Sequence, residues 1–231
     1  MKSLRKRLKK LEKIERMKYN PLIHRIHKKH NISSRTLHYI KSYGSHSHIY
    51  RTIVKESLWI LIVASIISSF GGLFLENIKN IFVSIVPLVI LMPTLNDMIG
   101  DYGMIMSSHF TTLLYKGRIS RKINKNEEMG ALFLKIMFIA LLTSFMSFLI
   151  SLVISRFSGY GVVWATSVKL LFIIMSDVII LLLILFLVTF FAGLYLYKRN
   201  LDPDNFLIPI TTSIADFGNM IVLTLLIVAF F

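Results

Sequence analysis

The chain has 231 residues, of which 55% are hydrophobic, and 27 lysines and arginines against 12 acidic residues give it a formal net charge of +15. In a soluble protein this charge would suggest a nucleic-acid partner. Most of the basic excess, however, precedes residue 56, and long apolar segments follow it, so no nucleic acid is expected and anionic phospholipid is the nearer partner. The chain has no cysteine, which excludes disulfides and thiolate metal sites.

Residues 1–56 predict a basic cytoplasmic extension. Apolar residues recur at helical spacing among its lysines and arginines: Leu4, Leu8, Leu11, Ile14 and Met17. Such a helix can lie on an anionic leaflet, or it can pack its apolar stripe on the rest of the protein or on a second copy. Histidines follow, and His24 and His27 share one helical face, but no set of four ligands has strong zinc spacing.

Residues 57–231 predict a membrane transport domain with five transmembrane helices, and hence an all-α, multi-pass protein of the cell membrane. The apolar runs cover residues 58–75, a second run from about 81, then 129–154, 162–197 and 206–231. With five crossings, the N-terminal extension, the loop 116–125 and Lys198-Arg199 fall on one side. The positive-inside rule then predicts a cytoplasmic N-terminus and an outside C-terminus.

The second run carries two acids, Asp97 and Asp101, within a polar cluster that also contains Asn96. A spacing of four residues puts both carboxylates on one helical face, where they repel each other unless a cation or a proton compensates them. Pro93 and Gly100 beside them predict a kinked or broken helix, which faces protein or a wet cavity. The alternative is a helix break at the membrane boundary with both acids in water.

Asp177 interrupts the fourth run near its middle. A charged side chain at that depth costs roughly 2.5–3.5 kcal/mol on insertion scales, so it should avoid lipid. Two interpretations stay open for Asp177, which are contact with an ion and a hydrogen bond to a neighbouring helix.

Asp216 lies about three turns inside the last run, roughly 15 Å deep in a bilayer of about 30 Å. Helical spacing groups it with other polar positions and a proline on one face: Pro209, Thr212, Ser213 and Asn219. Pro209 has no backbone N–H, so it frees the carbonyl of Asn205 as a further hard oxygen near this stripe. The alternative interpretation of Asp216 is a helix-packing residue that is satisfied by a hydrogen bond.

Two blocks of the sequence resemble the MgtE and solute carrier family 41 divalent-cation transporters. The first block contains Trp59, Gly71-Gly72, Leu75-Glu76, Met92-Pro93 and Gly100-Asp101-Tyr102-Gly103, and the second contains Asp202-Pro203-Asp204-Asn205, Pro209, Thr212, Ser213 and Asp216. Together they cover most of residues 58–231. The resemblance implies a homodimer with the ion path near its two-fold axis. Many members have Asn where this chain has Asp101, which keeps an oxygen ligand but adds charge.

The predicted function is transport of a divalent cation, with Mg²⁺ first and other divalent ions possible. Carboxylate, hydroxyl and carbonyl oxygens suit this ion, which gives up its water reluctantly. The residues predicted to contact it are Asp216, Asp101, Asp97, Asp177, Asn205, Thr212 and Ser213. No phosphate loop or nucleophile–base pair predicts an enzyme. Two alternatives remain, which are a proton- or sodium-coupled transporter of another substrate and a non-transporting anchor with a lipid-binding tail.

Overall fold

A computed structural model of the chain describes residues 49–116, 118–119, 127–199 and 201–231. Contacts divide the chain into two units, Met1–Glu56 and Ser57–Phe231. The second unit is described below. The predicted basic helix, the N-terminal histidines and most of the loop 116–125 lie outside the described residues. Every regular element within the described ranges is an α-helix, which confirms the all-α prediction.

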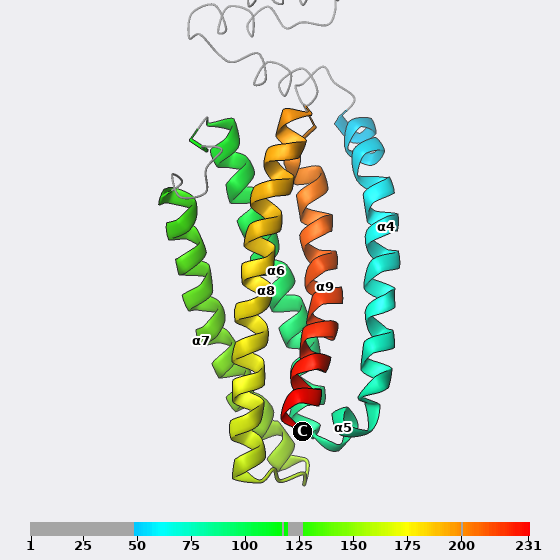
Figure 1. The fold of residues 1–231 in the computed structure, drawn as a ribbon, viewed down its shortest axis with the longest axis vertical. Coiled ribbons are helices and arrows are strands. Elements are labelled where there is room, and N and C mark those ends of the chain that lie inside the picture. The colour runs from blue at the N-terminus through cyan, green and yellow to red at the C-terminus, as the bar shows by residue number, and fades with distance from the viewer. Residues whose placement is uncertain (1–48, 117, 120–126, 200) are drawn as a thin grey trace, which may run out of the picture. The chain divides into compact units, whose positions relative to one another are not determined.

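The described helices follow one another along the chain as α4 (Ile49–Asn77), α5 (Lys79–Ser84), α6 (Val86–Tyr115), α7 (Glu127–Phe157), α8 (Trp164–Lys198) and α9 (Pro203–Phe230). The long helices alternate in direction, and the short α5 joins α4 to α6 at the end of the bundle where the C-terminus lies (Figure 1). This alternation follows from the short connections, because a helix with a short turn after it must return beside its predecessor.

Helix α6 packs against α7, α8 and α9, and it crosses behind α8 and α9 (Figure 1). Its apolar residues at helical spacing form a fully buried stripe: Leu88, Leu91, Leu95 and Ile99. The sequence predicts a kinked or broken helix here, and the break is wrong, since α6 runs unbroken through Pro93 and Gly100. Pro93 removes one backbone donor only, and α6 packs against three neighbouring helices.

Small and hydroxyl side chains allow α6, α8 and α9 to approach closely. A Cβ added at Gly103 would lie 3.2 Å from Thr211 Cβ and 3.3 Å from Leu185 Cδ1. One turn further along α6, the buried Ser107 hydroxyl lies 3.4 Å from the hydroxyls of both Thr189 and Thr211. Inside a bilayer lipid is as apolar as leucine, so close packing and such interhelical hydrogen bonds hold helices together.

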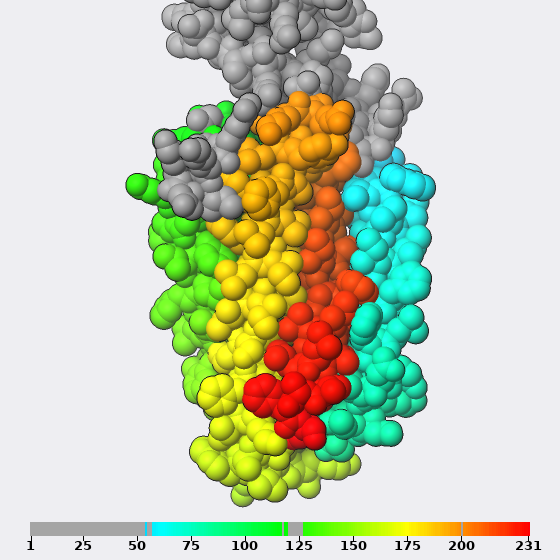
Figure 2. Space-filling model, viewed as in Figure 1, coloured from blue at the N-terminus to red at the C-terminus, as the bar shows by residue number. Residues whose placement is uncertain are grey.

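Helix α4 meets the rest of the unit along a seam with α9. Figure 2 shows α8, α9 and α4 side by side on one face of the molecule. The rings of Phe74 and Phe217 meet edge to face with centroids 5.9 Å apart, and a Cβ added at Gly71 would lie 2.5 Å from Met220 Sδ. Gly71 therefore lies where α4 approaches α9, against the flexible end of the Met220 side chain.

Four helices among the described residues are long and apolar enough to cross a membrane: Ser57–Asn77, Glu127–Phe157, Trp164–Lys198 and Pro203–Phe230. Large apolar side chains cover the outer surface, for example Phe138, which is 71% exposed. The protein is therefore a multi-pass membrane protein. Four of the five predicted crossings correspond to these helices. Helix α6 does not meet the same measure because polar residues fill its middle, so the count of five is not confirmed.

Candidate functional site

An open groove of about 460 Å³ lies between α6 and α9. Its lining comes from two helices: Pro93, Asn96, Asp97, Gly100, Asp101 and Met104 of α6, and Thr212 and Asp216 of α9. Three of these side chains are acidic and none is basic. The groove is therefore lined by acidic side chains at the contact of α6 and α9.

Helical periodicity explains why the acids share this groove. Asp97 and Asp101 are one turn apart on the exposed face of α6, and Thr212 and Asp216 are one turn apart on α9. Gly100 lies between the helices, where an added Cβ would lie 4.0 Å from Thr212 Cγ2. The acidic face of α6 thus lies directly beside the polar stripe of α9.

Asp216 is held from two other helices. Its Oδ1 accepts a hydrogen bond of 2.6 Å from Asn96 Nδ2 of α6, and its Oδ2 accepts one of 3.3 Å from Ser68 Oγ of α4. Asn219, one turn further along α9, donates from Nδ2 to Asn96 Oδ1 at 3.1 Å. The half-buried carboxylate is therefore the point where α4, α6 and α9 meet through polar side chains.

The structure brings four of the predicted cation-contacting residues together and leaves three apart. Asp177 is 0% exposed in the core of α8, does not line the groove, and has no hydrogen-bond partner for either carboxyl oxygen among the described residues. Ser213 is buried in α9 and does not line the groove either. The carbonyl of Asn205, which Pro209 frees, accepts a hydrogen bond of 3.4 Å from Ser57 Oγ.

Three polar neighbours of Asp216 were not predicted as site residues: Ser68, Asn96 and Asn219. The sequence carries a signal for two of them, because Asn219 follows Asp216 by one turn and Asn96 precedes Asp97 directly. Ser68 carries none, since a serine in an apolar helix commonly bonds its own backbone. Its hydrogen bond to Asp216 forms only because α4 lies beside α9.

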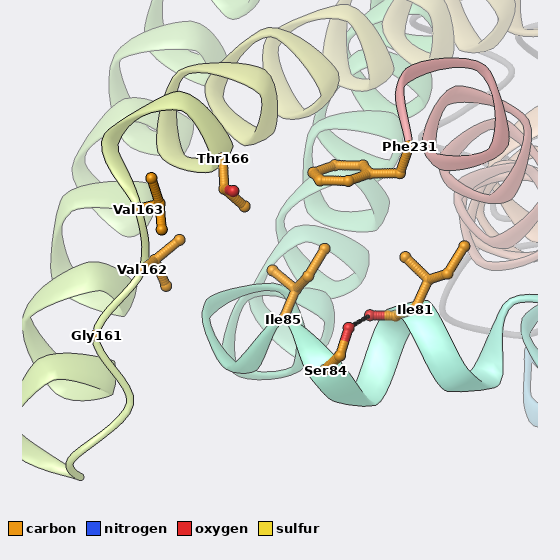
Figure 3. Close-up of a pocket in the computed structure, with 8 residues that line it drawn as sticks. All are labelled: Ile81, Ser84, Ile85, Gly161, Val162, Val163, Thr166 and Phe231. Carbon is orange, nitrogen blue, oxygen red and sulfur yellow. Dashed lines mark hydrogen bonds between the residues drawn. The ribbon is translucent and has the colours of Figure 1, made fainter.

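A second cavity, of about 440 Å³, lies at the end of the bundle that contains α5 (Figure 3). Ile81, Ile85 and the ring of Phe231 point into it, together with valines that precede α8 (Figure 3). The Ser84 hydroxyl donates to the Ile81 carbonyl at 2.7 Å, and no ionisable side chain lines the cavity. The acidic groove is thus the better candidate for an ion site.

Comparison with known families decides what kind of membrane protein carries this groove. The family model for MgtE, described as a divalent cation transporter, matches residues 92–226. The chain belongs to the MgtE family. No curated protein and no solved structure matches it. The MgtE match contains every residue that lines the groove and ends within α9. The acidic groove therefore lies entirely within the family segment.

The MgtE assignment confirms the predicted family and the general function, which is transport of divalent cations across a membrane. The residues of the groove fit such a cation, because divalent cations that prefer hard ligands bind carboxylate, amide and hydroxyl oxygens. All three kinds of oxygen line the groove.

Proposed function

We propose that the groove between α6 and α9 is one half of a Mg²⁺ path, which two copies of the chain complete. The observation that carries this proposal is the position of Asp97, Asp101 and Asp216 on one open groove with no basic residue in its lining. Asp97 and Asp101 are exposed on the outer face of α6. At membrane depth a charged side chain facing lipid costs roughly 2.5–3.5 kcal/mol, so water or a second copy must cover this face.

Helix α6 acts as the fifth crossing in this proposal. Its 30 residues extend about 45 Å, which is enough to span a bilayer. Its acids lie on the groove rather than among the apolar side chains of its buried face. Helix α6 is less apolar than the four helices that are apolar enough to cross a membrane, because one of its faces is polar. In this proposal that face does not contact lipid.

The proposed orientation has the N-terminus in the cytoplasm and the C-terminus outside. The Ser57 hydroxyl of α4 bonds the Asn205 carbonyl near the start of α9, and the rings of Tyr115 and Tyr197 at the ends of α6 and α8 lie 5.7 Å apart. The Tyr115 hydroxyl also donates to Asp202 Oδ1 at 3.3 Å, so these parts of the four helices lie at one end of the unit. The connections at that end carry most of the lysines and arginines of residues 57–231. The positive-inside rule favours this end as the cytoplasmic one. The basic residues 1–56 would then reach anionic lipid of the inner leaflet.

The groove suits a hydrated ion better than a stripped one. Among the described residues, no three histidine, aspartate or glutamate side chains converge to hold a metal directly. Mg²⁺ keeps several of its waters in many protein sites, so spaced carboxylates can attract and orient the hydrate. Thr212 Oγ1 and the Asn96 amide add neutral groups that can bond those waters.

Flux into liposomes tests this function. The triple variant Asp97→Asn/Asp101→Asn/Asp216→Asn should lose Mg²⁺ uptake, measured with an entrapped indicator at matched protein density. The control is Glu76→Gln, because Glu76 is exposed, pairs with Lys79 at 3.0 Å, and lies outside the groove. Uptake by the triple variant at the control's rate would refute the path. Repeating the assay with proton and sodium gradients separates a coupled transporter from a channel.

Cross-linking tests the second copy. The chain has no cysteine, so a single Ser108→Cys variant carries one reactive thiol on the exposed face of α6. If two α6 faces meet, oxidation in membranes should give a disulfide-linked dimer. A Phe138→Cys variant on the outer face of α7 serves as the control and should stay monomeric on denaturing gels. A dimer from Phe138→Cys alone would place the interface elsewhere.

A further inference from the structure

Asn96 and Asn219 form a chain of amide hydrogen bonds that ends at Asp216. Asn219 Nδ2 donates to Asn96 Oδ1 at 3.1 Å, and Asn96 Nδ2 donates to Asp216 Oδ1 at 2.6 Å. Asn219 is 0% exposed, whereas Asn96 is half-buried and lines the groove. One end of this chain is therefore in the protein core and the other touches the proposed ion site.

The charge on Asp216 dictates the direction of these bonds. An ionised carboxylate can only accept, so the Asn96 amide must turn its NH₂ toward Asp216 and its oxygen toward Asn219. Asn219 must then donate, and its own Oδ1 is left buried with no partner among the described residues. A buried acceptor without a donor is unfavourable, which indicates that Asp216 rather than the surroundings of Asn219 imposes this arrangement.

We propose that Asn96 and Asn219 are an amide relay that reports whether a divalent cation occupies Asp216. A cation at Asp216 repels the Asn96 NH₂ and attracts its oxygen. Both amides then turn over, so that Asn96 Oδ1 faces the ion or its water, and Asn96 Nδ2 donates to Asn219 Oδ1. In this state Asn96 is a ligand of the hydrated ion and Asn219 is the positioning residue.

The reversal breaks no hydrogen bond at Asn219 Oδ1, because that oxygen has no donor partner among the described residues. The relay also links the ion site to packing, since Asn219 lies on α9 beside the glycine that contacts α8. A Cβ added at Gly218 would lie 2.8 Å from Leu181 Cδ2. The relay rests on the proposed function only in placing the cation at Asp216.

Nuclear magnetic resonance of the full chain in lipid nanodiscs tests the relay directly. With ¹⁵N-labelled asparagine, the side-chain NH₂ signals of Asn96 and Asn219 are assigned from the spectra of Asn96→Leu and Asn219→Leu. Titration with Mg²⁺ should shift both signals in the wild type and neither in Asp216→Asn. Asn77 is the internal control, because its exposed amide donates to the Leu73 carbonyl outside the groove and should not shift.

Calorimetric titration of Mg²⁺ on the same samples separates the two proposals. Binding that Asp216→Asn weakens, with no change in the two amide signals of the wild type, would overturn the relay and leave the ion path intact. Mg²⁺ binding that Asp216→Asn does not weaken would overturn both.

A double-mutant cycle gives a second readout that does not depend on assignment. Asn96→Leu should weaken Mg²⁺ binding about tenfold and Asn219→Leu a few-fold, in line with the loss of one hydrogen bond each. The double variant should bind no more weakly than Asn96→Leu, because both changes break one relay. Effects that multiply in the double variant would show that the residues act independently and would overturn the relay.

Discussion

Replacing Asp216 by asparagine removes a charge from the groove and keeps the shape of the side chain. Asp216 accepts hydrogen bonds from Asn96 Nδ2 at 2.6 Å and from Ser68 Oγ at 3.3 Å. An asparagine in the same rotamer keeps its oxygen on Asn96 and turns its NH₂ to the Ser68 hydroxyl, which accepts as well as donates. Both contacts survive, so the variant should insert and fold, with a loss of about 1 kcal/mol because neither bond is charge-assisted any longer.

Asp216→Asn should weaken Mg²⁺ binding by more than it lowers the free energy of unfolding. A divalent ion separated from a carboxylate by one water, at roughly 5 Å, interacts with it by about 7 kcal/mol at an effective dielectric constant of about 20. Hydration of the ion and the carboxylate offsets most of this energy. If a third of it remains, about 2 kcal/mol is lost, which corresponds to roughly 30-fold weaker Mg²⁺ binding. We therefore expect Asp216→Asn to bind Mg²⁺ at least about 30-fold more weakly.

Two measurements on the same preparation check this prediction. Calorimetry gives the Mg²⁺ affinity, and thermal unfolding in detergent shows whether Asp216→Asn is folded. The Glu76→Gln variant is the matched control, since it removes one carboxylate charge from an exposed position outside the groove. A folded Asp216→Asn protein with the Mg²⁺ affinity of the control would refute the reasoning and place the ion elsewhere.

Three further predictions address other parts of the unit. Gly193→Ala presses a methyl group against the Phe110 ring, so overpacking of about 1–3 kcal/mol should lower the thermal unfolding midpoint despite the better helix propensity of alanine. Asp177→Leu removes a buried carboxyl group without a partner and should raise the free energy of unfolding by about 1–3 kcal/mol. Weaker Mg²⁺ binding in this variant would show that Asp177 belongs to the path. Ser68→Ala removes one donor that competes with the cation for Asp216, so calorimetry should give about threefold tighter Mg²⁺ binding, and weaker binding would contradict this.

The sequence by itself determines the class of this protein. Apolar segments of membrane length cannot leave backbone groups unpaired in lipid, so they must be helices. The sequence also places Asp216 about three turns inside the last apolar helix, because helix rise is constant at about 1.5 Å per residue. Its polar neighbours Thr212 and Asn219 follow from helical periodicity within α9. These inferences are local, since each depends on one helix only.

Only the tertiary structure decides which acids meet. Asp97, Asp101 and Asp177 are all carboxylates within long runs predicted to cross the membrane, and the sequence does not say which of them meet. Periodicity assigns each to a face of its own helix but gives neither the rotation nor the axial register of that helix against its neighbours. Those are set by close contacts between distant residues, such as Gly103 of α6 against Thr211 of α9.

The same packing turns Asp177 into the core and brings the amide of Asn96 to Asp216. Packing also bears on the continuity of α6, because local rules predict a kink or a break beside Pro93 and Gly100, whereas the helix continues through both while packed against α7, α8 and α9. Polar contacts between helices depend on side-chain positions to within an ångström, because a hydrogen bond weakens steeply beyond its short range. The spacing of residues along the sequence does not give positions to that precision. The groove and its chain of amide hydrogen bonds therefore follow only from the packing of the helices.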